Sequence, residues 1–292
     1  MPELPEVETI VRALARRVAG DAIVSVWLGE KPEPLKSLAP EIAAALQRSR
    51  ITAVRRVGKQ IVFDLEAGKG SARAARGHGP AARVRPAAAE SRTQRQWVVH
   101  LGMTGRLLVS APEAPVEPHT HAIVRLASGR ELRFVDPRRF GRLSVTGGDA
   151  GLATGSEPLD VDFERFAGLF RKRKTPIKSA LLNQKLLRGV GNIYADESLF
   201  RAGIRPRRRA ASLTRDELRR LRRALRQVLN AAIAAGGSSV ADYVNADGDQ
   251  GLFQFEHRVY QRDGEPCLVC GAVVKRVLVA GRGTHYCPRC QR

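Results

Sequence analysis

The stretch Cys267-Leu-Val-Cys270, followed after sixteen residues by Cys287-Pro-Arg-Cys290, holds all four cysteines of the chain. Two C-x-x-C pairs at this separation match a tetrahedral four-cysteine zinc site in which each pair lies on a tight turn. The valine-rich residues between the pairs, with Gly281-Arg282-Gly283, predict a β-hairpin whose turn carries an arginine. Four thiolate ligands leave no open coordination position, so we expect one structural Zn²⁺ that supports Arg282. Two disulfides or four unrelated thiols are the alternatives.

The composition of the whole chain favours a polyanionic partner. The 292 residues carry 50 Lys and Arg against 29 Asp and Glu, which gives a formal net charge of +21. With a zinc ribbon, nucleic acid is the leading partner and an anionic membrane surface is the alternative. The sequence has no apolar run of about 18 residues, no lipidation motif and no signal peptide. We therefore expect a soluble cytoplasmic protein, and a reducing compartment suits zinc-bound thiolates.

The N-terminus, Met1-Pro-Glu-Leu-Pro-Glu6, is a candidate reactive site. Residues 5–18 predict a helix with one apolar face, begun by Pro5. Glu3 and Glu6 at its start have a bland interpretation, because carboxylates are favourable at a helix N-terminus. An initiator methionine before a small residue is usually removed, however, which would expose the secondary amine of Pro2. Such an amine can form a Schiff base with a sugar C1′, and an adjacent carboxylate can move the protons.

Short strands are expected next, at 22–28, 51–57, 60–65, 97–101, 106–109, 121–127 and 131–136. This number of strands predicts a β-sandwich or barrel. Lys59 lies on the hairpin turn between two of them, where a solvated turn residue is the simple interpretation. Residues 68–96 interrupt the pattern with Ala, Arg and Gly, so we expect a disordered insertion there. The insertion is either a tolerated surface segment, which we favour, or a loose nucleic-acid contact.

Two turns carry apolar side chains beside basic ones: His100-Leu-Gly-Met103 and Asp136-Pro-Arg138-Arg-Phe140. Met and Phe in such places resemble the apolar wedges that enter a base stack. Filling of the protein core is the alternative for Met103 and Phe140.

The second half of the chain predicts basic helices after a linker at 149–160. Between residues 161 and 230 there are 19 Lys and Arg against six Asp and Glu, so 13 net positive charges lie in this segment. Helices are expected at 163–171, 176–184, 193–202 and 214–235, and Thr214 with Glu217 predicts a capping box. The turn at Gly191-Asn192 between two helices would suit a phosphate. A basic helix face can also be simply solvated.

Taken together, these motifs resemble those of the bacterial formamidopyrimidine-DNA glycosylases, over the whole chain except 68–96. The resemblance rests on Pro2-Glu-Leu-Pro-Glu-Val-Glu-Thr, His100-Leu-Gly-Met, Asp136-Pro-Arg-Arg-Phe-Gly, Gly189-Val-Gly-Asn-Ile-Tyr-Ala-Asp-Glu and the cysteine ribbon. It implies an α+β multidomain fold. The expected parts are a catalytic β-sandwich with an N-terminal helix (1–148), a helix-two-turn-helix domain (161–245), and a loop with a zinc-finger β-hairpin (246–292).

The same resemblance implies roles for individual residues. Pro2 resembles the nucleophile that attacks C1′, Glu3 the acid/base, and Lys59 the lysine that takes part in β,δ-elimination. Further DNA contacts are implied for His100, Met103, Arg138, Phe140, Asn192, Tyr243 and Arg282. Cys267, Cys270, Cys287 and Cys290 resemble the zinc ligands. Ala241 stands where several relatives carry a basic residue, in the loop after Ser-Ser-Val.

The implied activity is a bifunctional glycosylase and lyase that excises oxidised purines from double-stranded DNA, acting as a monomer. Two alternatives stay open. One is an endonuclease VIII-like enzyme for oxidised pyrimidines, although the opening motif and the Arg138/Phe140 pair favour the purine branch. The other is a non-catalytic zinc-ribbon protein that binds DNA, against which the intact Pro2-Glu3 pair argues.

Overall fold

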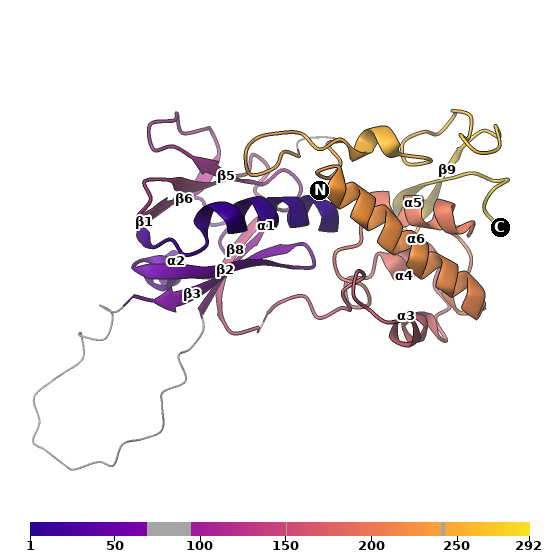
Figure 1. Cartoon of the computed structure of the whole chain (residues 1–292), viewed down its shortest axis with the longest axis horizontal. Coiled ribbons are helices and arrows are strands. Elements are labelled where there is room, and N and C mark those ends of the chain that lie inside the picture. The colour runs from indigo at the N-terminus through magenta and orange to yellow at the C-terminus, as the bar shows by residue number, and fades with distance from the viewer. Residues whose placement is uncertain (69–94, 150, 241–242) are drawn as a thin grey trace, which may run out of the picture. The chain divides into compact units, whose positions relative to one another are not determined.

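The computed structural model describes residues 1–68, 95–149, 151–240 and 243–292 (Figure 1). The chain forms two compact units. Unit 1 contains Met1–Ile10, Arg56–Gln60 and Leu152–Arg292, and unit 2 contains Val11–Arg55 and Ile61–Gly151. Most of the predicted insertion at 68–96 lies outside the described residues, as does Ala241. Arg95 and Gln96, which that prediction included, instead begin a strand.

Unit 2 is built on two four-stranded sheets, with strand orders β1-β6-β7-β5 and β2-β3-β4-β8. The strands are β1 (Ile23–Leu28), β2 (Ser49–Val57), β3 (Gln60–Ala67), β4 (Arg95–His100), β5 (Arg106–Ser110), β6 (Thr120–Leu126), β7 (Glu131–Val135) and β8 (Arg142–Gly147). Phe63 of β3 stacks on Trp97 of β4 at 4.7 Å between ring centroids, and both are buried. In the other sheet Val124, Leu132 and Phe134 are fully buried. The predicted β-sandwich class is confirmed.

Two elements of unit 2 are absent from the sequence-based prediction. Helix α2 (Ala39–Leu46) has eight residues and only Ile42, Ala45 and Leu46 are buried, so its apolar face is short. Strand β8 buries Leu143 but leaves most of its other side chains partly exposed. Its position is fixed by antiparallel pairing with β4, which is a long-range contact that local pattern does not encode.

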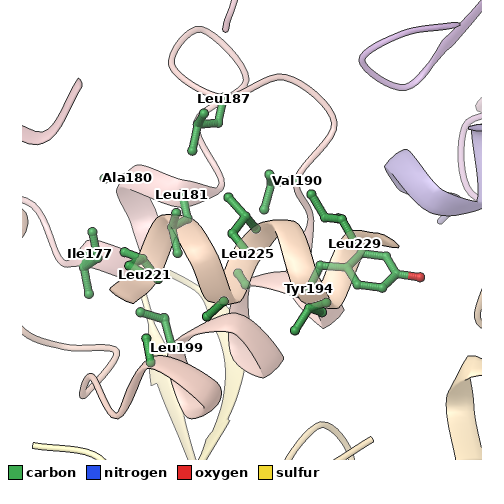
Figure 2. Packing of buried hydrophobic residues seen from close by; sticks show 14 of the residues in the cluster. Ile177, Ala180, Leu181, Leu187, Val190, Tyr194, Leu199, Leu221, Leu225 and Leu229 are labelled. Atoms are coloured by element: carbon green, nitrogen blue, oxygen red, sulfur yellow. The ribbon is translucent and has the colours of Figure 1, made fainter. Parts of the chain in front are cut away.

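Unit 1 is mainly helical and contains the first turns of α1 (Leu4–Val18). Its other helices are α3 (Phe163–Phe170), α4 (Ile177–Leu181), α5 (Asn192–Ala202) and α6 (Arg215–Ala234), with 3-10 turns at Ala210–Ser212 and Phe253–Glu256. The buried side of α6 packs Leu221, Leu225 and Leu229 against residues of α4 and α5, including Tyr194 (Figure 2). The predicted capping box is confirmed: Glu217 N donates to Thr214 Oγ1, and Thr214 N donates to Glu217 Oε2 at 2.8 Å.

The C-terminal ribbon forms the predicted β-hairpin, from β9 (Lys275–Val279) and β10 (Arg282–Tyr286). The turn between them has positive φ at Ala280 (48°) and Gly281 (75°). Arg282 is therefore the first residue after the turn and its side chain is exposed. Across the four described ranges, no helix has the length and apolar character needed to cross a bilayer.

Candidate active site and zinc centre

The N-terminus of α1 is buried against the N-terminus of α5, within unit 1. Pro2 and Glu3 are buried, whereas Met1 is 53% exposed. Leu4 N donates to Gly189 O at 3.0 Å, and Ile193 N donates to Glu3 Oε1 at 3.3 Å. The carboxylate of Glu3 thus accepts from one of the amides that a helix N-terminus leaves without an intrahelical partner.

Glu3 lies so close to the α5 backbone that only glycine fits opposite it. A Cβ on Gly191 would lie 2.1–2.4 Å from the three atoms of the Glu3 carboxyl group. The φ of Gly191 is −130°, so the need for glycine there is steric and not a matter of backbone strain. The Val190-Gly-Asn turn is therefore shaped to receive this side chain.

The environment of Glu3 gives its carboxyl group an intermediate proton affinity. Burial raises its pKa from 4.5 to about 7, Glu6 adds to that rise, and the positive charge of Lys59 opposes it. Glu3 Oε2 is buried and has no hydrogen-bond partner among the described residues. A carboxyl group with this pKa is present in both protonation states near neutral pH, which suits it to proton transfer.

Glu6 holds the N-terminal segment in place. Its Oε2 accepts from Glu3 N at 2.8 Å, and its Oε1 accepts from Ser238 N at 2.8 Å and from the Tyr194 hydroxyl. Burial raises the pKa of Glu6, and these donors work against that rise. Because both Glu6 oxygens are occupied by protein donors, Glu6 is suited to positioning rather than to proton transfer.

Lys59 lies at the tip of the β2–β3 hairpin, beside Gly58 with its φ of +61°. Its side chain is 8% exposed, so the solvated-turn interpretation is wrong. Burial lowers the pKa of Lys59, while the charges of Glu3 and Glu6 partly offset the effect and Arg282 adds to it. A lysine with a lowered pKa has a larger neutral fraction at physiological pH, which favours amine and proton-transfer chemistry.

The hairpin that carries Arg282 is anchored to α4 and α5 by buried polar contacts. Asn192 Nδ2 and Lys178 Nζ both donate to Gly283 O, at 3.0 and 2.9 Å. Lys178 Nζ also forms an ion pair with Asp196 Oδ1 at 2.7 Å, with both side chains fully buried. Asp196 Oδ2 in turn accepts from His285 N at 2.9 Å. The helix start at Asn192 and the hairpin turn are thus held as one rigid assembly.

Tyr243 is also buried in this region. Its hydroxyl donates to Gly236 O at 3.0 Å and lies 3.3 Å from Glu6 O. Burial raises the pKa of Tyr243. The segment that carries Ser238 is therefore bound to the N-terminal turn of α1 through both Glu6 and Tyr243.

The four cysteines meet as the sequence predicts. Their Sγ atoms all lie within 4.8 Å of one another, and two of the separations are 3.9 and 3.4 Å. A tetrahedron with Zn–S bonds of about 2.3 Å has S···S edges of about 3.8 Å, so the ligand set fits one Zn²⁺. All four are free thiols, which excludes the two-disulfide alternative. Cys267 and Cys287 pack on Phe200 and Val259, so the zinc centre joins the hairpin to the end of α5.

The other predicted DNA contacts belong to unit 2. Met103 and Phe140 are 43% and 53% exposed, which is inconsistent with core filling. The guanidinium of Arg138 lies 4.9 Å from the centroid of the Phe140 ring. Asp136 shapes this turn by accepting from Thr104 Oγ1, Arg138 N and Gly141 N. His100 Nδ1 accepts from Gly102 N at 3.0 Å. A Cβ on Gly102 would meet Phe140 C at 2.5 Å, so the two turns are in contact.

Three polar residues of the site were missed by sequence reasoning: Lys178, Tyr194 and Asp196. All are fully buried in α4 and α5. The available signal was a lysine inside the apolar run Pro176-Ile-Lys-Ser-Ala-Leu-Leu and an acid inside the apolar turn of α5. A charge in such a position is buried only when it has a partner.

Comparison with known proteins identifies the family to which the chain is similar. The model of the formamidopyrimidine-DNA glycosylase N-terminal domain matches residues 1–143, that of its H2TH domain matches 154–244, and a zinc finger found in FPG and IleRS matches 264–292. A formamidopyrimidine-DNA glycosylase of Solibacter usitatus is 42% identical over 298 residues and covers both chains fully. The chain belongs to the formamidopyrimidine-DNA glycosylase family.

Solved structures of the family agree. The Thermus thermophilus protein is 41% identical, with a TM-score of 0.80 over 99% of this chain and 98% of that one. The Lactococcus lactis protein, 32% identical, has been solved as a variant with Fapy-dG-containing DNA (TM-score 0.84) and as wild type with DNA that contains an oxidised pyrimidine (TM-score 0.82). Both cover the whole of each chain. The zinc finger and the helical domain of this family thus have their counterparts in unit 1.

Proposed function

We propose that this protein is a bifunctional DNA glycosylase and lyase that removes oxidised purines from double-stranded DNA. The observation that carries the proposal is the convergence of Lys59 and the α5 N-terminus on Glu3, the residue next to a buried Pro2. Membership of the family supplies the substrate class. A target base inside a duplex is out of reach, so the nucleotide must leave the stack before it reacts.

In the proposed reaction, removal of Met1 turns the Pro2 nitrogen from an amide into a secondary amine. This nitrogen attacks C1′ and displaces the damaged base, which takes up the proton that the amine loses, while the protonated Glu3 opens the sugar by donating to its ring oxygen. The positively charged iminium ion that results makes the C2′ proton acidic. Its loss expels the 3′ phosphate, and a second elimination expels the 5′ phosphate. Lys59, with its lowered pKa, is proposed to assist these eliminations.

DNA would be held by contacts that do not depend on sequence. We propose that Asn192 and Arg282, fixed to one another through Gly283, contact the phosphates of the damaged strand. Met103, Arg138 and Phe140 are proposed to fill the space that the extruded nucleotide leaves. Backbone contacts of His100 and Tyr243 complete the set. We place this monomeric enzyme in the bacterial cytosol, with the nucleoid.

Borohydride trapping tests the proposal. The protein should form a covalent adduct with a duplex that contains 8-oxoguanine opposite cytosine, and Pro2→Gly should lose most of it. Inserting one alanine between Met1 and Pro2 keeps the proline ring but makes its nitrogen an amide, so this variant should not trap through Pro2. Mass spectrometry of each protein verifies whether Met1 has been removed. Undiminished trapping by both variants would falsify the assignment of Pro2.

A panel of lesions separates the alternatives. An endonuclease VIII-like enzyme would cut a thymine glycol duplex faster than the 8-oxoguanine duplex, and we expect the reverse. A non-catalytic binder would retain either duplex without cutting it or forming an adduct.

A further inference from the structure

The outer face of α6 carries a cluster of arginines that the proposed reaction does not use. Arg219, Arg220, Arg222, Arg223 and Arg226 follow one another within about two turns and line a groove that Asp216, Gln227 and Asn230 complete. Arg220, Arg223 and Arg226 recur every three residues and are exposed, so they form one stripe. We call these three residues the α6 arginine stripe.

Among the described residues, no ion pair joins Arg220, Arg223 or Arg226 to an acid, and Asp216, which also lines the groove, pairs with Arg219. Neighbouring arginines do have partners: Arg219 pairs with Asp216 at 2.6 Å, and Arg222 Nε donates to Val161 O at 2.8 Å. The only two acids of α6, Asp216 and Glu217, lie in its first turn, and Glu217 bonds to Arg208. Like charges at this spacing repel one another and destabilise a helix. Three exposed positive charges without an ion-pair partner give this face a positive potential, which favours an anionic ligand.

The stripe faces away from the proposed lesion site. Leu221, Leu225 and Leu229 point from α6 into the core shared with α5 (Figure 2). The arginines occupy the opposite side of the same helix, whereas Asn192 begins α5 beyond that core. Asn192 is bonded to Gly283 of β10, which contributes nothing to the core that α6 shares with α5, so the stripe and Asn192 can be occupied by different segments of nucleic acid.

We propose that the α6 arginine stripe is a second DNA-binding surface, which holds the phosphate backbone of a duplex segment other than the one at the lesion site. The identity of the ligand rests on the proposed function, since an enzyme bound to DNA meets other duplex segments at high local concentration. Arg220 and Arg226 are separated by about 9 Å along the helix, at 1.5 Å per residue. This span matches about three phosphates of one strand at 3.4 Å each. The contact would allow transfer of the enzyme between DNA segments.

In the test, the proposed lesion site is first occupied by covalently bound DNA, and binding of a second duplex is then measured. The protein is trapped with borohydride on a short 8-oxoguanine duplex, and a labelled undamaged duplex is titrated in at low salt. The wild-type adduct should bind it, with log affinity falling against log salt at a slope of about −2.7 for three phosphate contacts. Between 50 and 200 mM salt this slope is roughly a 40-fold loss of affinity. The Arg220→Gln/Arg223→Gln/Arg226→Gln variant should lose second-duplex binding and still trap normally.

A matched variant controls for the loss of charge alone. Arg16→Gln/Lys31→Gln/Lys36→Gln also removes three exposed positive charges, all from unit 2, and should bind the second duplex as the wild type does. Equal binding by the stripe variant, or no second duplex on the wild-type adduct, would overturn the proposal. So would stripe-dependent binding of phosphatidylserine vesicles in place of duplex DNA. If no adduct forms, the proposed function fails. In that case sedimentation of the unreacted protein with undamaged duplex tests the inference separately. Two bound duplexes per chain would support a second surface, and one would overturn it.

Discussion

Glu3 is where burial, charge and steric fit meet in a single side chain. Its carboxyl group lies against the α5 N-terminus and within the field of Lys59, and one of its oxygens has no hydrogen-bond partner in the part of the chain that the structure describes. Burial of a carboxylate is unfavourable unless its charge is compensated. Lys59 and the α5 N-terminus offset only part of the cost of burying the Glu3 charge. The cost that remains raises the pKa, so that the group can donate or accept a proton near neutral pH.

Gly191→Ala tests the steric half of this arrangement. The new Cβ would overlap the Glu3 carboxyl group, which must then move by an ångström or more. Displacement on that scale costs about 10²-fold in rate, so we expect single-turnover incision to fall by roughly that factor while the melting temperature changes little. Gly168→Ala is the control, because a Cβ there meets nothing within 4 Å and its place in α3 makes alanine stabilising. Full activity in Gly191→Ala would show that Glu3 tolerates displacement.

Glu3→Gln tests the effect of the Glu3 charge, measured as the pH dependence of the free energy of unfolding. Below pH 4.5 the carboxyl group is protonated in both folded and unfolded chains, so it makes no difference there. As pH rises from 4.5 to about 7 the unfolded chain ionises first, and the folded state loses relative stability. The variant should therefore gain on the wild type over this window, by about 3 kcal/mol in the free energy of unfolding.

Urea denaturation of both proteins at pH 4.5 and pH 8 measures this gain. Glu113→Gln, which makes the same substitution at an exposed position, is the control measured in parallel. A constant difference between Glu3→Gln and the wild type across the range would mean that Glu3 ionises alike in both states.

At the scale of elements, the hairpin β9–β10 owes its position to the buried pair of Lys178 and Asp196 as much as to zinc. Zinc joins the two C-x-x-C turns, but the pair fixes Gly283 and His285, and so the strand that begins with Arg282. Lys178→Met should destabilise the protein by about 3–5 kcal/mol, because it leaves Asp196 buried and uncompensated. Thermal unfolding of the zinc-loaded protein measures this.

The double variant Lys178→Met/Asp196→Asn removes the stranded charge while keeping an oxygen that can accept from His285 N. It should recover a large part of the loss. If it is as unstable as the single variant, the cost comes from packing of the Lys178 stem and not from the charge.

Elements with strong local patterns were predictable from the sequence. The apolar face of α6, its capping box and the cysteine spacing each depend on residues close together in the chain, and the structure confirms them. β8 and α2 were missed because pairing with β4 and burial of a short apolar face decide them. The motifs indicated Pro2, Glu3 and Lys59, but the contacts of Glu6 with Tyr194 and Ser238 span more than 180 residues, so only the fold reveals them.

At the scale of the whole molecule, the candidate site lies within one compact unit. Met1–Ile10 and Arg56–Gln60 are covalently continuous with the sandwich, yet they pack with the helical unit. Glu3, Lys59 and Asn192 are therefore held together by contacts internal to unit 1, whereas Met103, Arg138 and Phe140 are carried by unit 2. This division separates the groups proposed to break bonds from those proposed to occupy the base stack, and we expect mutations in one set to leave the packing of the other unchanged.

Residues 69–94 give the last test, because they carry six basic residues and one acid, or +5 of the net +21. β3 ends at Ala67 and β4, its neighbour in the sheet, begins at Arg95, so an Asn-Gly turn after Gly68 can close a hairpin in their place. As a tolerated insertion, the segment can be replaced in this way without changing incision of a short 8-oxoguanine duplex or the salt slope of binding. As a DNA contact, each phosphate lost would flatten that slope by about 0.9. We expect the unchanged slope, and a flattening of two or more would assign these arginines to the DNA.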